Sequence, residues 1–173
     1  MNMDIKSFIR DIPDFPQTMV IFRDITPLMS NGEALRYVVQ KMAEPFKNAG
    51  IQSVAAIESR GFFFGPCIAL ELCCGFTPIR KKGKLPWQTD SEEYSLEYGT
   101  ATIEMHKDAL SKGDKVLLLD DVLATGGTIS AASRLVEKQG ALVSGMVFLI
   151  ELDFLQGRKN IKVNCPIHSI VHY

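Results

Sequence analysis

Apolar residues along the chain alternate between strand-like runs and helix-like spacing. The runs SVAAIE (53–58), KVLLLD (115–120) and ALVSGMVFLIEL (141–152) are apolar on both faces, as in strands buried inside a sheet. The segments 31–50 and 128–141 carry apolar residues at helical spacing, so each predicts an amphipathic helix. These two kinds of segment follow one another in turn, which indicates strands connected by helices.

The remaining segments extend this alternation. Residues 61–75 predict a mostly buried helix opened by glycine, and ATIEMHK (101–107) predicts a half-exposed strand because its apolar residues alternate with polar ones. FTPIR (76–80) predicts a short strand and 162–173 a last edge strand. Two local signals complete the pattern. Asp4 can cap a short N-terminal helix, and Pro45 should kink or shorten the helix that Gly50 would stop.

Strands that alternate with helices, with doubly buried central runs, predict an α/β domain around a mainly parallel sheet. At 173 residues a single domain, 1–173, is expected. In such sheets ligands bind at the carboxyl ends of the strands. The residues that follow each apolar run are therefore the candidates for a ligand-binding site.

Composition narrows the class of protein. Apolar residues make up 46% and charged residues 23%, as in ordinary globular proteins, and the formal net charge is −1. That charge gives no basic surface for nucleic acid or an anionic membrane, so neither is expected as a partner. No apolar run approaches the roughly 18 residues of a membrane span. The four cysteines lack CxxC spacing and the N-terminus is unlike a secretory signal, so a reduced, cytoplasmic protein is expected.

The stretch KVLLLDDVLATGGT (115–128) interrupts its apolar run with two aspartates and a glycine turn. A turn of small residues leading into a helix exposes backbone N–H groups, which form a site for a phosphate. Gly126 and Gly127 allow close approach, and Thr125 and Thr128 add hydroxyl donors. The nucleotide motifs GxxxxGK[ST] and GxGxxG are both missing.

Asp120 and Asp121 would repel a phosphate, so we expect them to face other groups. Ribose hydroxyls donate hydrogen bonds to carboxylates, and magnesium binds carboxylate oxygens. A phosphate, a sugar diol and a cation together point to a phosphorylated ribose. The alternative is that the aspartates only end a strand and the glycines only make a turn.

VLLLDDVLATGGT (116–128) resembles the motif for phosphoribosyl pyrophosphate (PRPP) in the type I phosphoribosyltransferase family. Three further stretches resemble, in order, those of members that act on adenine: 15–28, 55–72, and 79–110 without its centre. The resemblance implies the type I fold, with a base-covering hood at about 1–35 and a mobile lid at about 83–101. It also implies transfer of the phosphoribosyl group of PRPP to adenine, giving AMP and pyrophosphate. Magnesium would enter as the PRPP complex, without a dedicated metal site in the protein, and a homodimer is implied.

The resemblance also assigns residues to PRPP. It implies that Ala124, Thr125, Gly126, Gly127 and Thr128 hold the 5′-phosphate, and that Asp120 and Asp121 meet the ribose. Arg60, in the loop ESRGF (58–62), offers a fork of donors to pyrophosphate, and the family implies a cis peptide at Glu58-Ser59. Arg80, Lys81 and Lys84 would neutralise the leaving group, with part of this stretch crossing to a second subunit. Without the resemblance, Arg60 and this charge run would be read as solvated surface.

The lid and the hood supply the remaining residues. The polar stretch 91–99 is too long for a simple hairpin and suits a lid. The resemblance gives its Glu97 the catalytic role near the base, with Tyr98 beside the PRPP site. In the hood, Phe22 can stack on a purine and Val122 can approach its other face. Backbone groups around Ile21 and Arg23 would read the amino edge of the base.

Three alternatives remain open at this point. The same fold could act on hypoxanthine, xanthine or orotate, although the stretches around 20–27 and 94–99 favour adenine. A non-catalytic PRPP-binding regulator would need a nucleic-acid surface that the charge does not support. A plain interaction module would leave four ordered ligand motifs unexplained.

The three histidines lack a partnering Cys or an HExxH pattern, and we expect none of them to be catalytic.

Overall fold

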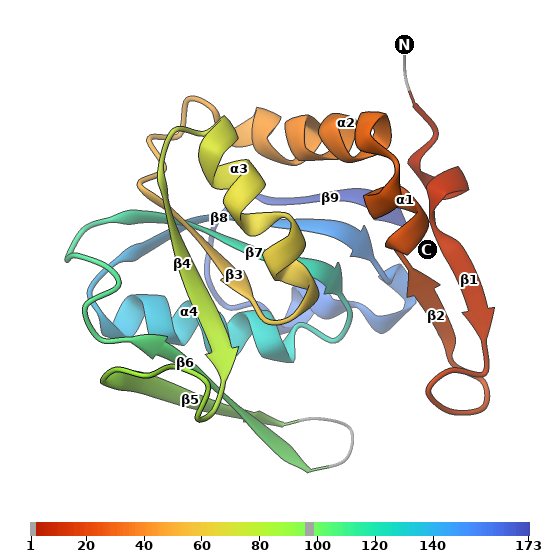
Figure 1. The fold of residues 1–173 in the computed structure, drawn as a ribbon. Coiled ribbons are helices and arrows are strands. Elements are labelled where there is room, and N and C mark those ends of the chain that lie inside the picture. Colours follow the sequence, from red (N-terminus) through yellow and green to blue (C-terminus); the bar gives the residue numbers. More distant parts are fainter. Residues whose placement is uncertain (1–2, 96–98) are drawn as a thin grey trace.

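The computed structural model describes residues 3–95 and 99–173. Among these residues the centre of the molecule is a seven-stranded sheet in the order β5-β6-β4-β3-β7-β8-β9 (Figure 1). Neighbouring strands from β4 to β9 are parallel, and β6 and β5 add an antiparallel hairpin at one edge. The strands are β3 (Ser53–Ile57), β4 (Gly75–Lys81), β5 (Thr89–Ser95), β6 (Thr100–His106), β7 (Lys115–Leu123), β8 (Leu142–Glu151) and β9 (Ile167–His172). The predicted α/β class with a mainly parallel sheet is confirmed.

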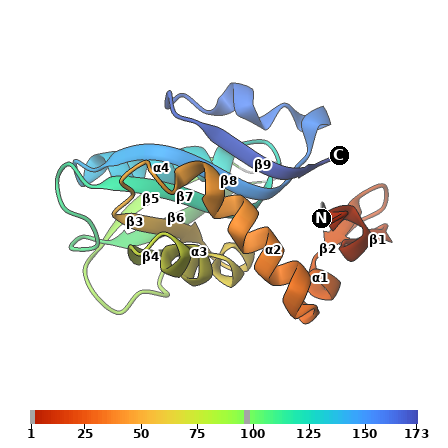
Figure 2. The same ribbon diagram turned by 90° about the horizontal axis from the view of Figure 1, so that it is seen from above.

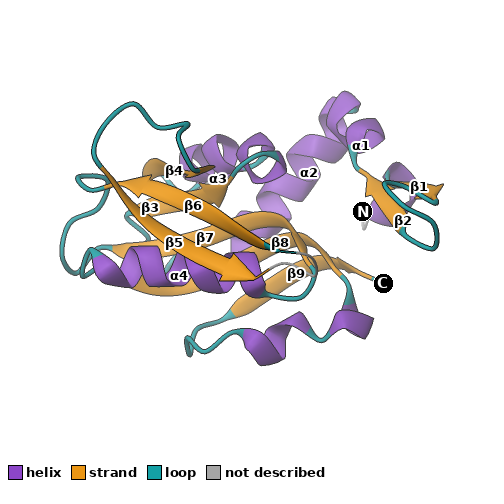
Figure 3. Ribbon diagram, turned by 90° about the horizontal axis from the view of Figure 1, so that it is seen from below, coloured by secondary structure: helices purple, strands orange, loops and turns teal. Residues whose placement is uncertain are grey.

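Helices cover both faces of this sheet. The α-helices are α1 (Thr26–Ser30), α2 (Gly32–Ala43), α3 (Gly65–Glu71) and α4 (Gly127–Lys138). Short 3₁₀ helices lie outside the strands and α-helices: η1 (Ile5–Phe8), η2 (Glu44–Phe46), η3 (Arg60–Phe63), η4 (Asp153–Leu155) and η5 (Gly157–Asn160). Viewed from above and below, α2 and α3 lie on one face and α4 on the other (Figures 2 and 3). In the described part of the chain no helix is long and apolar enough to span a membrane.

The alternation of side chains along β7 explains why both faces need helices. Leu117 and Leu119 are fully buried in the cluster that includes α2 and α3, whereas Val116 and Leu118 are fully buried in the cluster that includes α4. Successive residues of a strand point to opposite faces, so a continuous apolar run fills two cores at once. The central strands are thereby fixed in place, and the polar residues at their carboxyl ends are fixed with them.

A separate two-stranded sheet stands beside the main one. Strands β1 (Arg10–Pro13) and β2 (Ile21–Asp24) pair in antiparallel fashion (Figure 1). Phe15, in the loop that connects the two strands, meets Phe22 of β2 edge to face, with ring centroids 5.2 Å apart. The sequence did not predict these strands, because each is only four residues long and half exposed.

Four sequence predictions need correction. Strand β7 does not stop at Asp120 but continues to Leu123, since β8 is long enough to pair with Val122 and Leu123. Segment 61–75 is not one buried helix: it divides into η3 and α3, and Leu70 is 79% exposed. The helix that Gly50 was expected to stop ends at Ala43 instead, and Pro45 lies in the 3₁₀ turn that follows it. The shortening predicted at Pro45 is confirmed.

The fourth correction concerns the stretch expected as a loop between two strands. Residues 89–95 form β5, which pairs with β6 from Thr89 opposite His106 to Ser95 opposite Thr100. The polar residues 91–93 are accommodated because this hairpin lies at the edge of the sheet, where one face meets water. Glu97 and Tyr98 lie outside the described residues, so the motion and contacts predicted for the lid stay predictions.

Candidate active site

The carboxyl ends of β3 and β7 bring the two predicted phosphate loops together. These strands are neighbours in the sheet, so the residues that follow Ile57 and those around Asp120 lie at the same edge. A Cβ on Gly61 would lie 3.3 Å from both Asp120 Oδ1 and the Leu119 carbonyl oxygen. Glycine at this position therefore lets the loop after β3 rest directly against β7. The Glu58-Ser59 peptide at the start of that loop is cis, as the resemblance implied.

Arg60 crosses from this loop to three groups. Its Nη2 lies 2.7 Å from Asp121 Oδ2, an ion pair in which that oxygen falls outside the angular range of a hydrogen bond. Its Nη1 donates a 3.2 Å hydrogen bond to the Arg23 carbonyl, and its guanidinium carbon lies 4.7 Å from the centroid of the Phe22 ring. Residues expected to bind pyrophosphate, ribose and base are thus in contact.

The two aspartates share an electrostatically unfavourable position. Burial raises the pKa of the Asp120 carboxyl well above its ordinary value, and the neighbouring Asp121 charge raises it further. Burial also raises the pKa of Asp121, although the Arg60 guanidinium opposes this shift. The Asp121 backbone N–H donates to Asp120 Oδ1 at 2.9 Å. Carboxylates with few protein donors and a raised pKa are suited to receive hydroxyl donors or a cation from a ligand.

The predicted 5′-phosphate loop forms the N-terminus of α4. Gly126 caps this helix with φ of +82°, a conformation that favours glycine. A small recess of about 50 Å³ opens here, lined mainly by residues of the motif: Asp120, Val122, Leu123, Ala124, Thr125, Gly126, Thr128, Ile129 and Phe148. Backbone N–H groups at the start of a twelve-residue helix make this recess suitable for an anion. The structure therefore brings Asp120, Val122 and most of the residues from Leu123 to Thr128 around one recess.

The basic stretch at the carboxyl end of β4 is organised by Glu58, a residue that the sequence analysis did not single out. Glu58 is 8% exposed and accepts from Arg80 Nε and Lys84 Nζ, each at 2.9 Å. Burial alone would raise the pKa of Glu58, but the hydrogen bonds from Lys84 and Arg80 outweigh it and lower that pKa. The Lys81 side chain is exposed, and its backbone N–H donates to Glu58. The only sequence signal for Glu58 was its position directly after a buried strand.

The η5 turn packs against the phosphate loop, a contact that the sequence analysis did not predict. A Cβ on Gly126 would lie 2.4 Å from the Gly157 carbonyl oxygen, and a Cβ on Gly157 would lie 2.2 Å from the Ala124 carbonyl oxygen. Asn160 Nδ2 donates to the Thr125 carbonyl at 2.8 Å. The η5 turn therefore packs backbone to backbone against the loop. No sequence pattern around 157–160 indicates this contact, because it depends on the tertiary fold.

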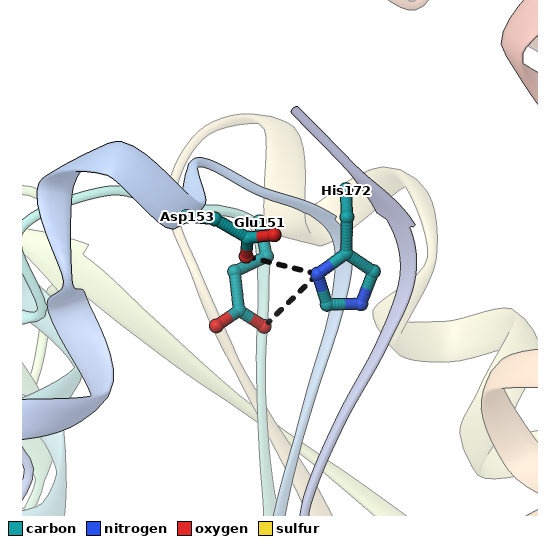
Figure 4. Close-up of side chains that lie close together, drawn as sticks. All are labelled: Glu151, Asp153 and His172. Atoms are coloured by element: carbon teal, nitrogen blue, oxygen red, sulfur yellow. Dashed lines mark hydrogen bonds and ion pairs between the residues drawn. The ribbon is translucent and has the colours of Figure 1, made fainter.

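The described residues contain a further group whose side chains are close enough to hold a metal ion. Ligand atoms of Glu151, Asp153 and His172 lie within 4.8 Å of one another (Figure 4). His172 Nδ1 is 2.9 Å from Asp153, but both oxygens of Glu151 are bound by Arg158 at 2.6 and 2.7 Å. A cation would have to compete with that guanidinium. We interpret the group as a structural network that joins the ends of β8 and β9 to η5.

A recess of about 660 Å³ elsewhere in the described part of the chain contains none of the predicted site residues. It is lined by the N-terminal segment, α2 and β9, with Lys6, Lys41, His168 and His172 as its titratable members besides Asp4 and Tyr37. Its size does not make it the active site, because the residues suited to bind the ligand lie at the carboxyl ends of β3 and β7.

A parallel α/β sheet with a phosphate loop, paired aspartates and an arginine loop at that edge defines the type I phosphoribosyltransferase class.

Comparisons with known proteins agree with this class. The phosphoribosyl transferase domain family matches residues 30–166. An adenine phosphoribosyltransferase from Kosmotoga olearia is 52% identical over 99% of this chain and 100% of its own length, and one from Thermotoga petrophila is also 52% identical. The crystal structure of adenine phosphoribosyltransferase from Rhodothermus marinus superposes with a TM-score of 0.93 at 51% identity, covering 98% of this chain and 96% of that one. The chain belongs to the adenine phosphoribosyltransferase family.

Proposed function

We propose that this chain transfers the 5-phosphoribosyl group of PRPP to adenine, giving AMP and pyrophosphate. The observation that carries the residue assignments is the 2.7 Å contact between Arg60 and Asp121. It joins the loop after β3 to the aspartate pair of β7, so one substrate can touch both. A relative from Saccharomyces cerevisiae, 37% identical with a TM-score of 0.90, was solved with an imino-altritol bisphosphate and adenine.

PRPP enters as its magnesium complex. The 5′-phosphate is bound at the N-terminus of α4, where backbone N–H groups and hydroxyls can donate to it. The ribose hydroxyls donate to Asp120 and Asp121. The pyrophosphate meets the cationic groups at the carboxyl ends of β3 and β4, namely Arg60, Arg80, Lys81 and Lys84, with Tyr98 beside them. The 5′-phosphate residues are Ala124, Thr125, Gly126, Gly127 and Thr128.

Adenine lies between the Phe22 ring and Val122. Backbone groups of Ile21 and Arg23 face its amino edge, and a carbonyl there accepts from the 6-amino group but meets only an acceptor in hypoxanthine. This chemistry favours adenine over 6-oxopurines. The competing reading, a phosphoribosyltransferase for another base, would need a donor at the position of the Arg23 carbonyl.

The reaction exchanges one bond at the ribose C1 for another. The C1–oxygen bond to pyrophosphate breaks through an oxocarbenium-like state, and N9 of adenine forms the new bond to C1. Asp120 and Asp121 place negative charge near the developing cation, and the basic residues stabilise the leaving pyrophosphate. Magnesium, bound to PRPP, neutralises part of the pyrophosphate charge. Glu97 accepts the proton that adenine loses as N9 bonds to C1, and the lid excludes water.

Two wider assignments accompany this reaction. We propose a homodimer, in which part of the stretch 80–84 reaches the neighbouring subunit, and a cytoplasmic location. Lys81 and Lys82 are exposed, so they are free to make such contacts. The formal net charge of −1 supports small-molecule substrates and not nucleic acid.

Product analysis tests the proposal. The purified protein is incubated with PRPP, magnesium and one base at a time, and nucleotide and pyrophosphate are quantified. We expect AMP and pyrophosphate in equal amounts with adenine, and loss of both with a chelator. Product from hypoxanthine at the adenine rate would remove the base assignment. PRPP binding without product from any base would favour a regulator.

A further inference from the structure

Arg60 occupies the place that the proposed function gives to the base. Its guanidinium lies over the Phe22 ring, 4.7 Å from guanidinium carbon to ring centroid. The same side chain donates to the Arg23 carbonyl at 3.2 Å. A planar group on the Phe22 face with an N–H directed at that carbonyl reproduces two contacts expected of adenine and its amino group.

The third contact of Arg60 reaches into the ribose subsite. Its Nη2 lies 2.7 Å from Asp121 Oδ2, on a side chain that is 9% exposed. Arg60 itself is 28% exposed, so it spans from the solvent-facing loop into the buried end of β7. One residue thereby covers groups assigned to the base and to the sugar.

We propose that Arg60 closes the base pocket of the free protein and must leave the Phe22 ring before adenine can bind. This inference rests on the proposed function and adds a second role to Arg60, besides its contact with pyrophosphate. A pyrophosphate group offers charged, bidentate acceptors, which hold a guanidinium more strongly than a ring face and one carbonyl. The leaving group of PRPP therefore draws Arg60 off the base pocket and opens it.

The closed position reduces the affinity of the free protein for adenine. Apparent affinity falls by the fraction of molecules whose pocket is open, so a pocket that is open about one tenth of the time binds about tenfold more weakly. A cation–π contact, a hydrogen bond and an ion pair together are sufficient for a bias of that size. Removing the Arg60 side chain should therefore strengthen adenine binding while it impairs turnover.

Calorimetric titration of adenine into the free protein, without PRPP, measures this effect. We expect Arg60→Ala to bind adenine about tenfold more tightly than the unmodified protein. Arg60→Lys, which keeps the charge near Asp121 but loses the planar fork, should also bind more tightly, and it provides a second test if Arg60→Ala does not fold. Both variants should form AMP more slowly, because the pyrophosphate contact is lost or weakened.

Arg36→Ala is the matched control. Arg36 is an exposed arginine on α2, away from the site residues, and its removal changes the net charge equally. Its adenine affinity should be unchanged; an equal gain there would assign the effect to net charge and overturn the inference. Unchanged or weaker adenine binding in both Arg60 variants would overturn it too, even if the unmodified protein forms AMP. Failure of the unmodified protein to form AMP would instead contradict the proposed function.

Discussion

The guanidinium of Arg23 lies 3.7 Å from the centroid of the Tyr173 ring. Arg23 belongs to β2 of the hood, whereas Tyr173 follows β9 and is held by backbone hydrogen bonds to Glu151 and Asp153. Arg23 also forms an ion pair with Asp11 on β1. Tyr173 therefore connects the two-stranded sheet to the edge of the main sheet. This contact lies next to the Arg23 carbonyl, which we propose accepts from the amino group of adenine.

Loss of the Tyr173 ring should loosen the hood. We expect Tyr173→Ala to raise KM for adenine by about threefold to tenfold, since a partly buried cation–π contact is worth roughly 0.5–2 kcal/mol. KM for PRPP should change little. Tyr173→Phe keeps the ring and should behave as the unmodified protein in steady-state kinetics. Equal impairment in Tyr173→Phe would show that the hydroxyl matters and not the ring.

The contact between η5 and the phosphate loop gives a second prediction. In Gly157→Ala the new Cβ would lie 2.2 Å from the Ala124 carbonyl oxygen, so the loop has to move. We expect KM for PRPP to rise and the free energy of unfolding to fall by about 1–3 kcal/mol, as in other overpacked sites. Kinetics and denaturant unfolding measure the two effects. Gly32→Ala, where a Cβ meets nothing within 4 Å, is the control and should change neither.

The aspartate pair, which we assign to the ribose of PRPP, should lower the stability of the free protein at neutral pH. Because the pKa of Asp120 is raised in the folded protein, its proton is bound more tightly there than in the unfolded chain. The contribution of this one carboxyl to stability is therefore greatest at acid pH, and it is lost as pH rises from the ordinary carboxyl pKa through the raised one. Asp120→Asn keeps the oxygen that accepts from the Asp121 N–H but cannot ionise.

We expect Asp120→Asn to raise the Tm of the free protein at pH 7 by a few degrees, at about 2–4 °C for each kcal/mol. The difference from the unmodified protein should shrink towards pH 4. Asp108→Asn, at an exposed position, is the control. A lower Tm at pH 7 would contradict the destabilisation that we assign to the buried Asp120 carboxylate.

Asp121→Asn should weaken PRPP binding, and normal PRPP affinity in this variant would contradict the ribose role of Asp121.

Glu97 is the residue whose loss should affect chemistry most selectively. We expect Glu97→Gln to lower kcat by about 100-fold or more, the range for a lost acid–base group, with a smaller change in PRPP affinity. Glu93 lies on β5 with an exposed side chain, so Glu93→Gln is the control and should keep normal turnover. Rapid-quench measurement of AMP formation separates chemistry from product release. An unchanged chemical step in Glu97→Gln would remove the assignment.

The sequence predicted the sheet because its central strands are buried on both faces. A continuous run such as 115–119 leaves few alternatives to a parallel core strand. The ligand class of motif 120–128 could also be predicted, since small residues at a helix N-terminus suit a phosphate and paired aspartates suit ribose hydroxyls or a cation. Family resemblance then added residues such as Arg60, whose isolated pattern is that of any surface arginine.

The remainder depended on contacts between distant segments. Glu58 gathers Arg80 and Lys84 only because β3 and β4 are neighbours, and Gly157 reaches Ala124 only through the turn after β8. The hairpin β1–β2 and strand β5 are short or polar, so neither shows strong periodicity. Local pattern could not indicate these features, because tertiary pairing decides them.

A crystal structure with AMP and magnesium pyrophosphate bound tests the central claim most directly. The account predicts the nucleotide phosphate on residues 124–128, its base between Phe22 and Val122, and Arg60 turned from the Phe22 ring towards pyrophosphate. A nucleotide whose base lies elsewhere, or whose phosphate avoids the α4 N-terminus, would contradict the account.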